Sequence, residues 1–146
     1  MALETLIEQI RRVPNTGFGN GASDSEIEDA QRKLQVTFPT DYRIFLSRLG
    51  WGGIDYWELY GLGSDVPIYL DLVRITNSER QEMSLCLPSA LLPIYNDGGG
   101  NLFCLNTEKA KNDSCPIVFW DHDLDENQEP EAMADSFEVW LSALIS

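Results

Sequence analysis

The order in which helical and extended patterns follow one another limits the folds that this chain can adopt. In the first third, apolar residues recur three or four positions apart in three stretches, which is helical spacing. After residue 91 they gather in short extended runs, and helical spacing returns at 137–144, while 67–83 is ambiguous. Helices that precede a group of strands are typical of α+β proteins. We therefore expect one α+β domain, residues 1–146, with a largely antiparallel central sheet on which the N-terminal helices and a C-terminal helix pack.

The clearest strand signal is a β-hairpin in the middle of the chain. Two apolar runs, 91–95 and 101–105, flank the sequence Asn96-Asp97-Gly98-Gly99-Gly100, whose residue types favour a tight turn. Residues 116–120 and the aromatic stretch 56–62 indicate further strands. The central part of the chain therefore supplies most of the predicted sheet.

Local signals mark where helices begin. Ser23 and Glu26 have the spacing of a capping box at the start of the second helix, and Asp135 and Glu138 are placed to cap the last one. The glycine-rich stretch 15–21 is interpreted as a loop. Because it follows a helix rather than a strand and lacks the lysine of a P-loop, it does not predict a phosphate-binding site.

The net charge is −14, because 24 Asp and Glu outnumber 10 Lys and Arg. Hydrophobic residues make up 43% and aromatic residues 10%, which is typical of a folded protein rather than of a disordered acidic chain. An acidic folded surface repels nucleic-acid phosphates and anionic membranes, and it attracts cationic proteins. We therefore expect no direct contact with nucleic acid or membrane, and a basic protein as the partner.

The cysteines and the absence of targeting patterns favour the cytoplasm. Cys86, Cys104 and Cys115 are odd in number, have no C-x-x-C spacing and lie beside apolar residues, so we expect buried free thiols. The chain has neither a basic-then-apolar leader nor about 18 consecutive apolar residues. The expectation is a cytoplasmic protein that does not span a membrane.

The last third of the chain carries an unbalanced acidic run. No Lys or Arg follows Lys111, whereas acidic residues crowd the stretch 121–131. A solvated loop is one interpretation; the other is a negative patch that attracts a basic partner. On the second interpretation the contact residues are Asp121, Asp123, Asp125, Glu126 and Glu129.

Three further residues are weaker candidates for partner contact. Trp57 and Tyr60 flank the acidic Glu58, and strand alternation predicts that one of the three faces water. Aromatic side chains serve either as core residues or as anchors of an interface. Asp97 and the glycines after it form a turn, whose backbone N–H groups are also candidates for contact with a partner chain.

The chain offers little for catalysis or metal binding. The alternation Asp121, Asp123, Asp125 resembles a calcium loop, but Glu126 stands where an EF-hand needs glycine, and the final glutamate is missing. His122 is the only histidine, so catalysis needs it within reach of a nucleophile such as Cys104 or Cys115, both of which are expected to be buried. We therefore predict no enzyme activity, no metal and no cofactor, with a loose divalent site and a hydrolase as alternatives.

Several segments together resemble the Smi1/Knr4 family, also called the SUKH superfamily. They include Gly98-Gly99-Gly100-Asn101 and Trp120-Asp121-His122-Asp123, and they run in the family's order along nearly the whole chain. Asn101 stands where an acidic residue is expected in the family. The matching stretches are 25–34, 38–46, 51–53, 92–94, 98–105, 115–123 and 134–141.

The resemblance implies an α+β fold without catalysis. Its commonest functional implication is a bacterial immunity protein, which binds a cognate polymorphic toxin, often a nuclease, and neutralises it by stoichiometric protein–protein interaction. The alternative that it implies is a regulatory or scaffolding protein that binds a housekeeping partner.

Overall fold

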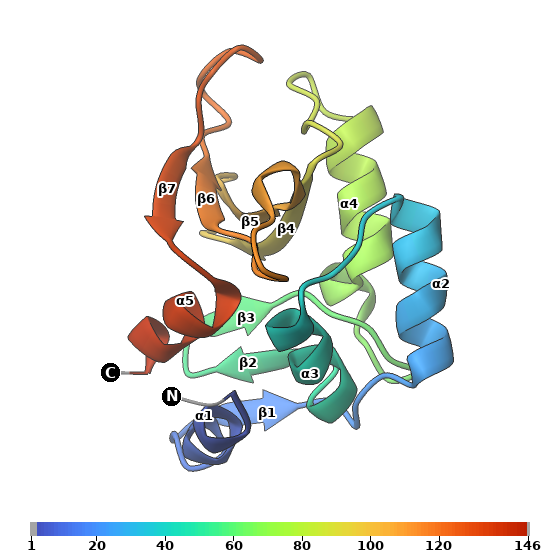
Figure 1. The fold of residues 1–146 in the computed structure, drawn as a ribbon, viewed down its shortest axis with the longest axis vertical. Helices are drawn as coiled ribbons and strands as arrows, with labels where there is room; N and C mark the ends of the chain where they lie inside the picture. Colours follow the sequence, from blue (N-terminus) through green and yellow to red (C-terminus); the bar gives the residue numbers. More distant parts are fainter. Residues whose placement is uncertain (1–2, 146) are drawn as a thin grey trace.

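The computed structural model describes residues 3–145 and contains five α-helices, seven β-strands and two short 3-10 turns. The elements are α1 (Leu3–Ile10), β1 (Thr16–Phe18), α2 (Asp24–Leu34), α3 (Thr40–Arg48), β2 (Gly52–Ile54), β3 (Trp57–Leu59), η1 (Ile68–Leu70), α4 (Leu72–Gln81), β4 (Leu91–Asn96), β5 (Leu102–Asn106), η2 (Thr107–Lys109), β6 (Ile117–Trp120), β7 (Glu131–Ala134) and α5 (Phe137–Leu144). The expected α+β architecture with N-terminal helices and a C-terminal helix is confirmed (Figure 1).

The seven strands form one sheet whose spatial order is the order of the chain, β1 to β7, with every neighbouring pair antiparallel. The hairpin predicted at 91–105 is present as β4 and β5, and it lies in the middle of the sheet. In Figure 1, β1 to β3 run across the lower half of the molecule, whereas β6 and β7 rise in the upper half beneath the loop that joins them. This loop, residues 121–130, therefore lies at the end of the sheet opposite α1.

Capping residues explain where two of the helices begin. The Ser23 hydroxyl accepts a hydrogen bond from Glu26 N, and the Glu26 carboxylate accepts one from Ser23 N, as the capping box predicted. At α5 the prediction was wrong in its choice of residue. The N-cap is Ser136, whose hydroxyl accepts a hydrogen bond from Val139 N, because Asp135 lies one position too early.

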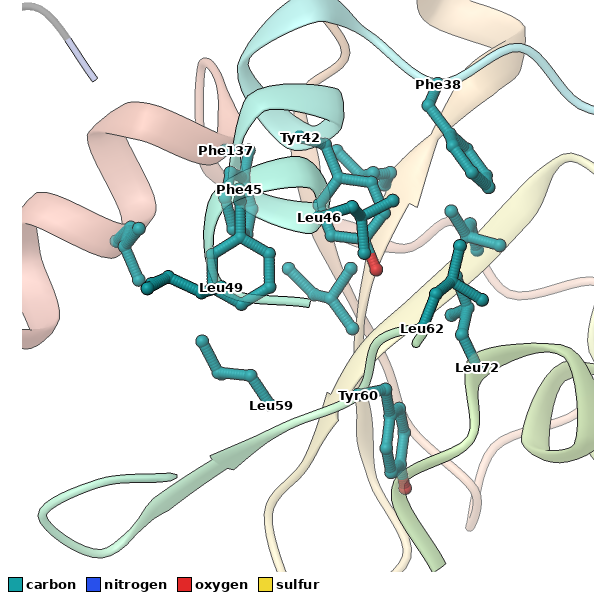
Figure 2. Packing of buried hydrophobic residues seen from close by; sticks show 14 of the residues in the cluster. Phe38, Tyr42, Phe45, Leu46, Leu49, Leu59, Tyr60, Leu62, Leu72 and Phe137 are labelled. Carbon is teal, nitrogen blue, oxygen red and sulfur yellow. The ribbon is translucent and has the colours of Figure 1, made fainter. Parts of the chain in front are cut away.

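The main core lies between the sheet and the five α-helices, with α4 contributing Leu72. Its centre is aromatic, and Figure 2 shows Tyr42, Phe45 and Phe137 facing one another from α3 and α5. The ring centroids of Tyr42 and Phe137 are 5.0 Å apart and those of Phe45 and Phe137 are 5.3 Å apart, in the edge-on geometry that aromatic quadrupoles favour. Helix α5 is thereby held against α3 although 88 residues or more separate them in the sequence.

A second, smaller cluster covers the other side of the β4–β6 region. It consists of Leu87, Leu91, Leu102, Cys104, Val118 and Trp120, with Leu85 packed against it. These residues come from three neighbouring strands and from the segment that follows α4. The segment is therefore folded back onto the sheet, which creates the wall of a cavity described below.

The structure corrects some details of these expectations and completes others. The stretch 15–21 contains strand β1 at the sheet edge rather than only a loop, and the acidic run leads into strand β7. The stretch 56–62 contributes the three residues of β3, which pairs with β2 in a hairpin, and α4 resolves the ambiguous region 67–83. Cys104 and Cys115 are buried as free thiols, but Cys86 is exposed, because it lies in the irregular segment after α4.

Among residues 3–145, none of the helices has the length and apolarity needed to cross a bilayer.

Candidate partner-binding surface

The loop between β6 and β7, residues 121–130, is called the acidic loop here. It contains two consecutive turns, in which Leu124 N donates to Asp121 O at 3.2 Å and Gln128 N donates to Asp125 O at 3.2 Å. The Gln128 amide joins the two ends of the loop, since its Nε2 donates to Asp121 O at 2.8 Å and its Oε1 accepts from Asp121 N at 3.1 Å. An otherwise exposed loop is therefore held in a defined shape.

Most of the carboxylates of the acidic loop face solvent. Asp123, Asp125, Glu126 and Glu129 are exposed, and Asp121 is half-buried. None of the ion pairs among residues 3–145 joins these five carboxylates to a Lys or Arg. The imidazole of His122 lies close by, with its Nε2 3.4 Å from Asp123 Oδ1. Four of the five predicted contact residues are therefore exposed acidic residues of one loop.

The acidic loop is joined to the tip of the β4–β5 hairpin. Asn101 Oδ1 accepts a hydrogen bond from His122 N at 3.0 Å and lies 2.6 Å from the ring nitrogen Nδ1 of His122. Gly100 lies against the same ring, where an added Cβ atom would be 3.3 Å from it. Asn101, which departs from the family pattern, thus positions His122 and with it the start of the acidic loop.

Asp97 is exposed at the hairpin tip, where its side chain stabilises the turn. Its Oδ1 accepts hydrogen bonds from Gly99 N at 2.8 Å and from Asn101 N at 3.2 Å. Asn96 Oδ1 accepts from Gly98 N at 2.8 Å and from Gly100 N at 3.4 Å. The expectation that bare N–H groups are available here was wrong, because the two side chains before the glycines satisfy them. Asp97 therefore stays a candidate only through its charge.

Trp57 belongs to a row of half-buried aromatic side chains that crosses four strands. The row consists of Trp57, Tyr95, Phe103 and Phe119, with successive ring centroids 4.9, 5.8 and 5.3 Å apart. Trp140 of α5 packs on it, with centroids 6.5 Å from Trp57 and 5.9 Å from Phe103.

This aromatic row ends beside the acidic loop. Phe119 pairs with Glu131 across β6 and β7, directly after the loop returns to the sheet. Tyr95, Phe103 and Phe119 could not be recognised as a set from the sequence, because their alignment depends on the pairing of Tyr95 with Phe103 and of Phe103 with Phe119. An apolar strip beside a charged loop has the two parts of a protein interface, a hydrophobic centre and a polar rim.

Tyr60 lies in the core instead. Its side chain is only 7% exposed, and burial raises its pKa to about 12. Glu58 is the residue of this stretch that faces water, as strand alternation predicted for one of the three. Tyr60 offers too little surface to a partner, and we leave it out of the interface.

The cysteines are poorly suited to nucleophilic chemistry with His122. Burial raises the pKa of Cys104 well above its ordinary value, and burial together with Asp41 and Asp113 raises that of Cys115 to about 11. Both residues are therefore thiols at neutral pH, whereas the thiolate is the nucleophile.

One group of potential metal ligands is present in the described part of the chain. Asp121, His122 and Asp123 bring one ligand atom each within 4.8 Å of one another. Calcium takes six to eight oxygen ligands, which three neighbouring residues of an exposed loop do not supply. We therefore interpret the acidic loop as a charged surface for a partner rather than as a calcium site.

These features define a class: an α+β domain with a seven-stranded antiparallel sheet that carries an acidic loop beside a strip of aromatic residues. The chain belongs to the SUKH family described as SMI1-KNR4 cell-wall, whose family model matches residues 3–146. The resemblance noted from the motifs is thereby confirmed.

Two individual proteins illustrate the relationship. The chain is 28% identical over 133 residues to YnaB of Bacillus subtilis strain 168, described as an uncharacterized protein, and the match covers 88% of this chain and 80% of YnaB. A crystal structure of a protein from Pseudomonas syringae pv. tomato has the same fold, with a TM-score of 0.67 at 17% identity. That match covers 94% of this chain and 93% of the other.

Proposed function

We propose that this protein is a bacterial immunity protein that binds a cognate toxin, a basic nuclease, and neutralises it by one-to-one association. Membership of the SUKH family supports an immunity-like role. The single observation that carries the proposal is the acidic loop, whose five carboxylates, four of them exposed, have no Lys or Arg partner among residues 3–145.

The charge of the loop suits a nuclease because such an enzyme holds its substrate with Lys and Arg around its active site. An acidic loop of defined shape competes for the same positive surface. Electrostatic attraction of this kind raises the association rate and selects the partner, whereas rim charges add little affinity in salt. Affinity then comes from the aromatic row, since large rigid rings are the common hot spots of interfaces.

The protein acts in this scheme by binding alone. It performs no chemistry, requires no cofactor or metal, and acts in the cytoplasm, where a toxin that entered or was made in the cell meets its substrate. The toxin loses activity either because its active site is covered or because substrate is blocked from a neighbouring site.

Growth rescue tests the proposal. The gene is expressed together with each toxin gene adjacent to it in its own genome, and survival is scored for the wild type and for Asp121→Lys/Asp123→Lys/Asp125→Lys. The matched control is Glu8→Lys/Glu28→Lys/Glu108→Lys, which makes the same charge change at exposed residues outside the loop. We expect rescue by the wild type and the control, and reduced rescue by the loop variant at equal folded protein.

Failure to rescue growth from any neighbouring toxin contradicts the proposal. In that case the alternative, a regulatory or scaffolding protein with a housekeeping partner, becomes the better account. Loss of rescue in His122→Ala with retained toxin binding would instead indicate catalysis, since a purely binding protein does not need the imidazole as an acid or base.

A further inference from the structure

A cavity of about 250 Å³ lies between the end of α4 and the tip of the β4–β5 hairpin. It is separate from the aromatic row, because Trp120 and Phe119 are successive residues of β6 and point to opposite faces of the sheet. Six of the residues that line it matter here: Glu79, Leu85, Asn96, Gly100, Trp120 and His122. His122 brings the start of the acidic loop to the rim of the cavity.

Glu79 places a carboxylate in this cavity without a bonding partner. The side chain is half-buried, and within residues 3–145 its carboxylate forms neither a hydrogen bond nor an ion pair. The titratable groups that interact with it are His122 of the acidic loop, Tyr60 after β3 and Cys104 of β5. Burial raises the pKa of Glu79, and the charge of His122 opposes this rise.

A carboxylate that has lost water without gaining a donor is stabilised when a cation enters. The other walls suit the stem of a long side chain, since Leu85 and Trp120 are apolar and belong to the second hydrophobic cluster. The cavity is smaller than the ~300–1,000 Å³ of sites for drug-sized ligands and cofactors. Its size therefore fits one amino-acid side chain better than a separate small molecule.

The geometry points to a specificity pocket in which Glu79 receives an arginine side chain of the protein partner, with the methylene stem against Leu85 and Trp120. This inference rests on the proposed function, because it takes the partner to be a basic protein. Arginine fits the pocket better than lysine, since a planar guanidinium pairs with a carboxylate through two hydrogen bonds and is less strongly hydrated than an ammonium group.

The pocket can be tested without the partner. The probe is N-acetyl-arginine methylamide, titrated into the 15N-labelled protein at 150 mM salt, which weakens non-specific attraction to the acidic loop. We expect saturable shifts of the Trp120 indole N–H and of the Leu85 and Gly100 amides, with a dissociation constant on the order of 1–10 mM. The citrulline analogue has the same shape without the charge and should bind at least about tenfold more weakly.

Two variants and one control variant locate the binding. Glu79→Gln should weaken arginine binding by about tenfold or more, whereas Glu82→Gln, which removes the same charge at the exposed C-cap of α4, should leave it within about twofold. Ser84→Tyr keeps Glu79 but fills the cavity that Ser84 helps to line, and it should also abolish the shifts. Native-like spectra of each variant show that the fold is retained.

Equal binding of the citrulline analogue, or unchanged binding in Glu79→Gln, would overturn the inference. So would shifts confined to the acidic loop, because they would place the cation outside the cavity. These outcomes are independent of growth rescue. An immunity protein without this pocket would rescue growth yet bind no arginine at Glu79, and a scaffolding protein with it would bind arginine without rescuing growth.

Discussion

Replacement of Gly100 by alanine tests whether the hairpin tip holds the acidic loop in place. Gly100 has φ +102°, a conformation that costs a residue with a side chain about 1–3 kcal/mol. The added Cβ would also lie 3.3 Å from the His122 ring, which must move. Movement of the ring weakens its contact with Asn101 Oδ1, which is worth about 1 kcal/mol. We expect a total loss of about 2–4 kcal/mol in the free energy of unfolding.

The two neighbouring glycines separate these contributions. Gly98 has φ +91° but open space around its Cβ position, so Gly98→Ala should cost only the backbone strain, about 1–2 kcal/mol. The Cβ position of Gly99 meets only Asp97 Oδ1 at 3.4 Å, so Gly99→Ala should change stability by less than about 0.5 kcal/mol.

Urea unfolding followed by tryptophan fluorescence measures all three variants. With a slope of about 2 kcal/mol per M, Gly100→Ala should lower the midpoint by about 1–2 M. Equal midpoints for the Gly100 and Gly99 variants would refute the reasoning, because neither the strained backbone nor the contact with His122 would then contribute to stability.

Three further results are expected. Burial raises the pKa of Asp41, so the folded state binds the proton of this carboxyl group more readily than the unfolded state does. The stability of the wild type relative to Asp41→Asn should therefore fall as the pH rises from about 3 to 6. A rise would show that the hydrogen bonds to the Asp41 carboxylate outweigh burial. Ser136→Ala should cost about 1 kcal/mol in urea unfolding while Asp135→Ala costs little, and the reverse order would restore Asp135 as the cap. Ellman's reagent should react quickly with one thiol of the native protein, with none in native Cys86→Ser, and with all three thiols of the wild type after unfolding. Two fast-reacting thiols in the native state would contradict the buried positions of Cys104 and Cys115.

Segments with strong local signals were predictable from the sequence. The β4–β5 hairpin has a turn sequence with few alternatives, and the capping box of α2 satisfies backbone donors through residues three positions apart. The edge strands β1 and β7 were missed because each has only three or four residues, and pairing with a neighbour rather than residue pattern makes them strands.

The candidate surface was predictable only in its charges. An acidic run without Lys or Arg is visible in the sequence, whereas its exposure depends on the turns that Gln128 holds together. The aromatic row depends on strand register, and the pocket of Glu79 depends on how α4 meets the hairpin tip. The spacing of residues along the sequence does not predict such non-local contacts.

The most direct test of the central claim is the association rate of the protein with its toxin at several ionic strengths. The account predicts a fast rate that falls steeply with salt, and a reduction of about tenfold or more at low salt, with a flatter salt dependence, for Asp121→Lys/Asp123→Lys/Asp125→Lys. The control Glu8→Lys/Glu28→Lys/Glu108→Lys should stay closer to the wild type. Identical rates for the loop variant and the wild type at every salt concentration would contradict the account, because the acidic loop would then take no part in recognition.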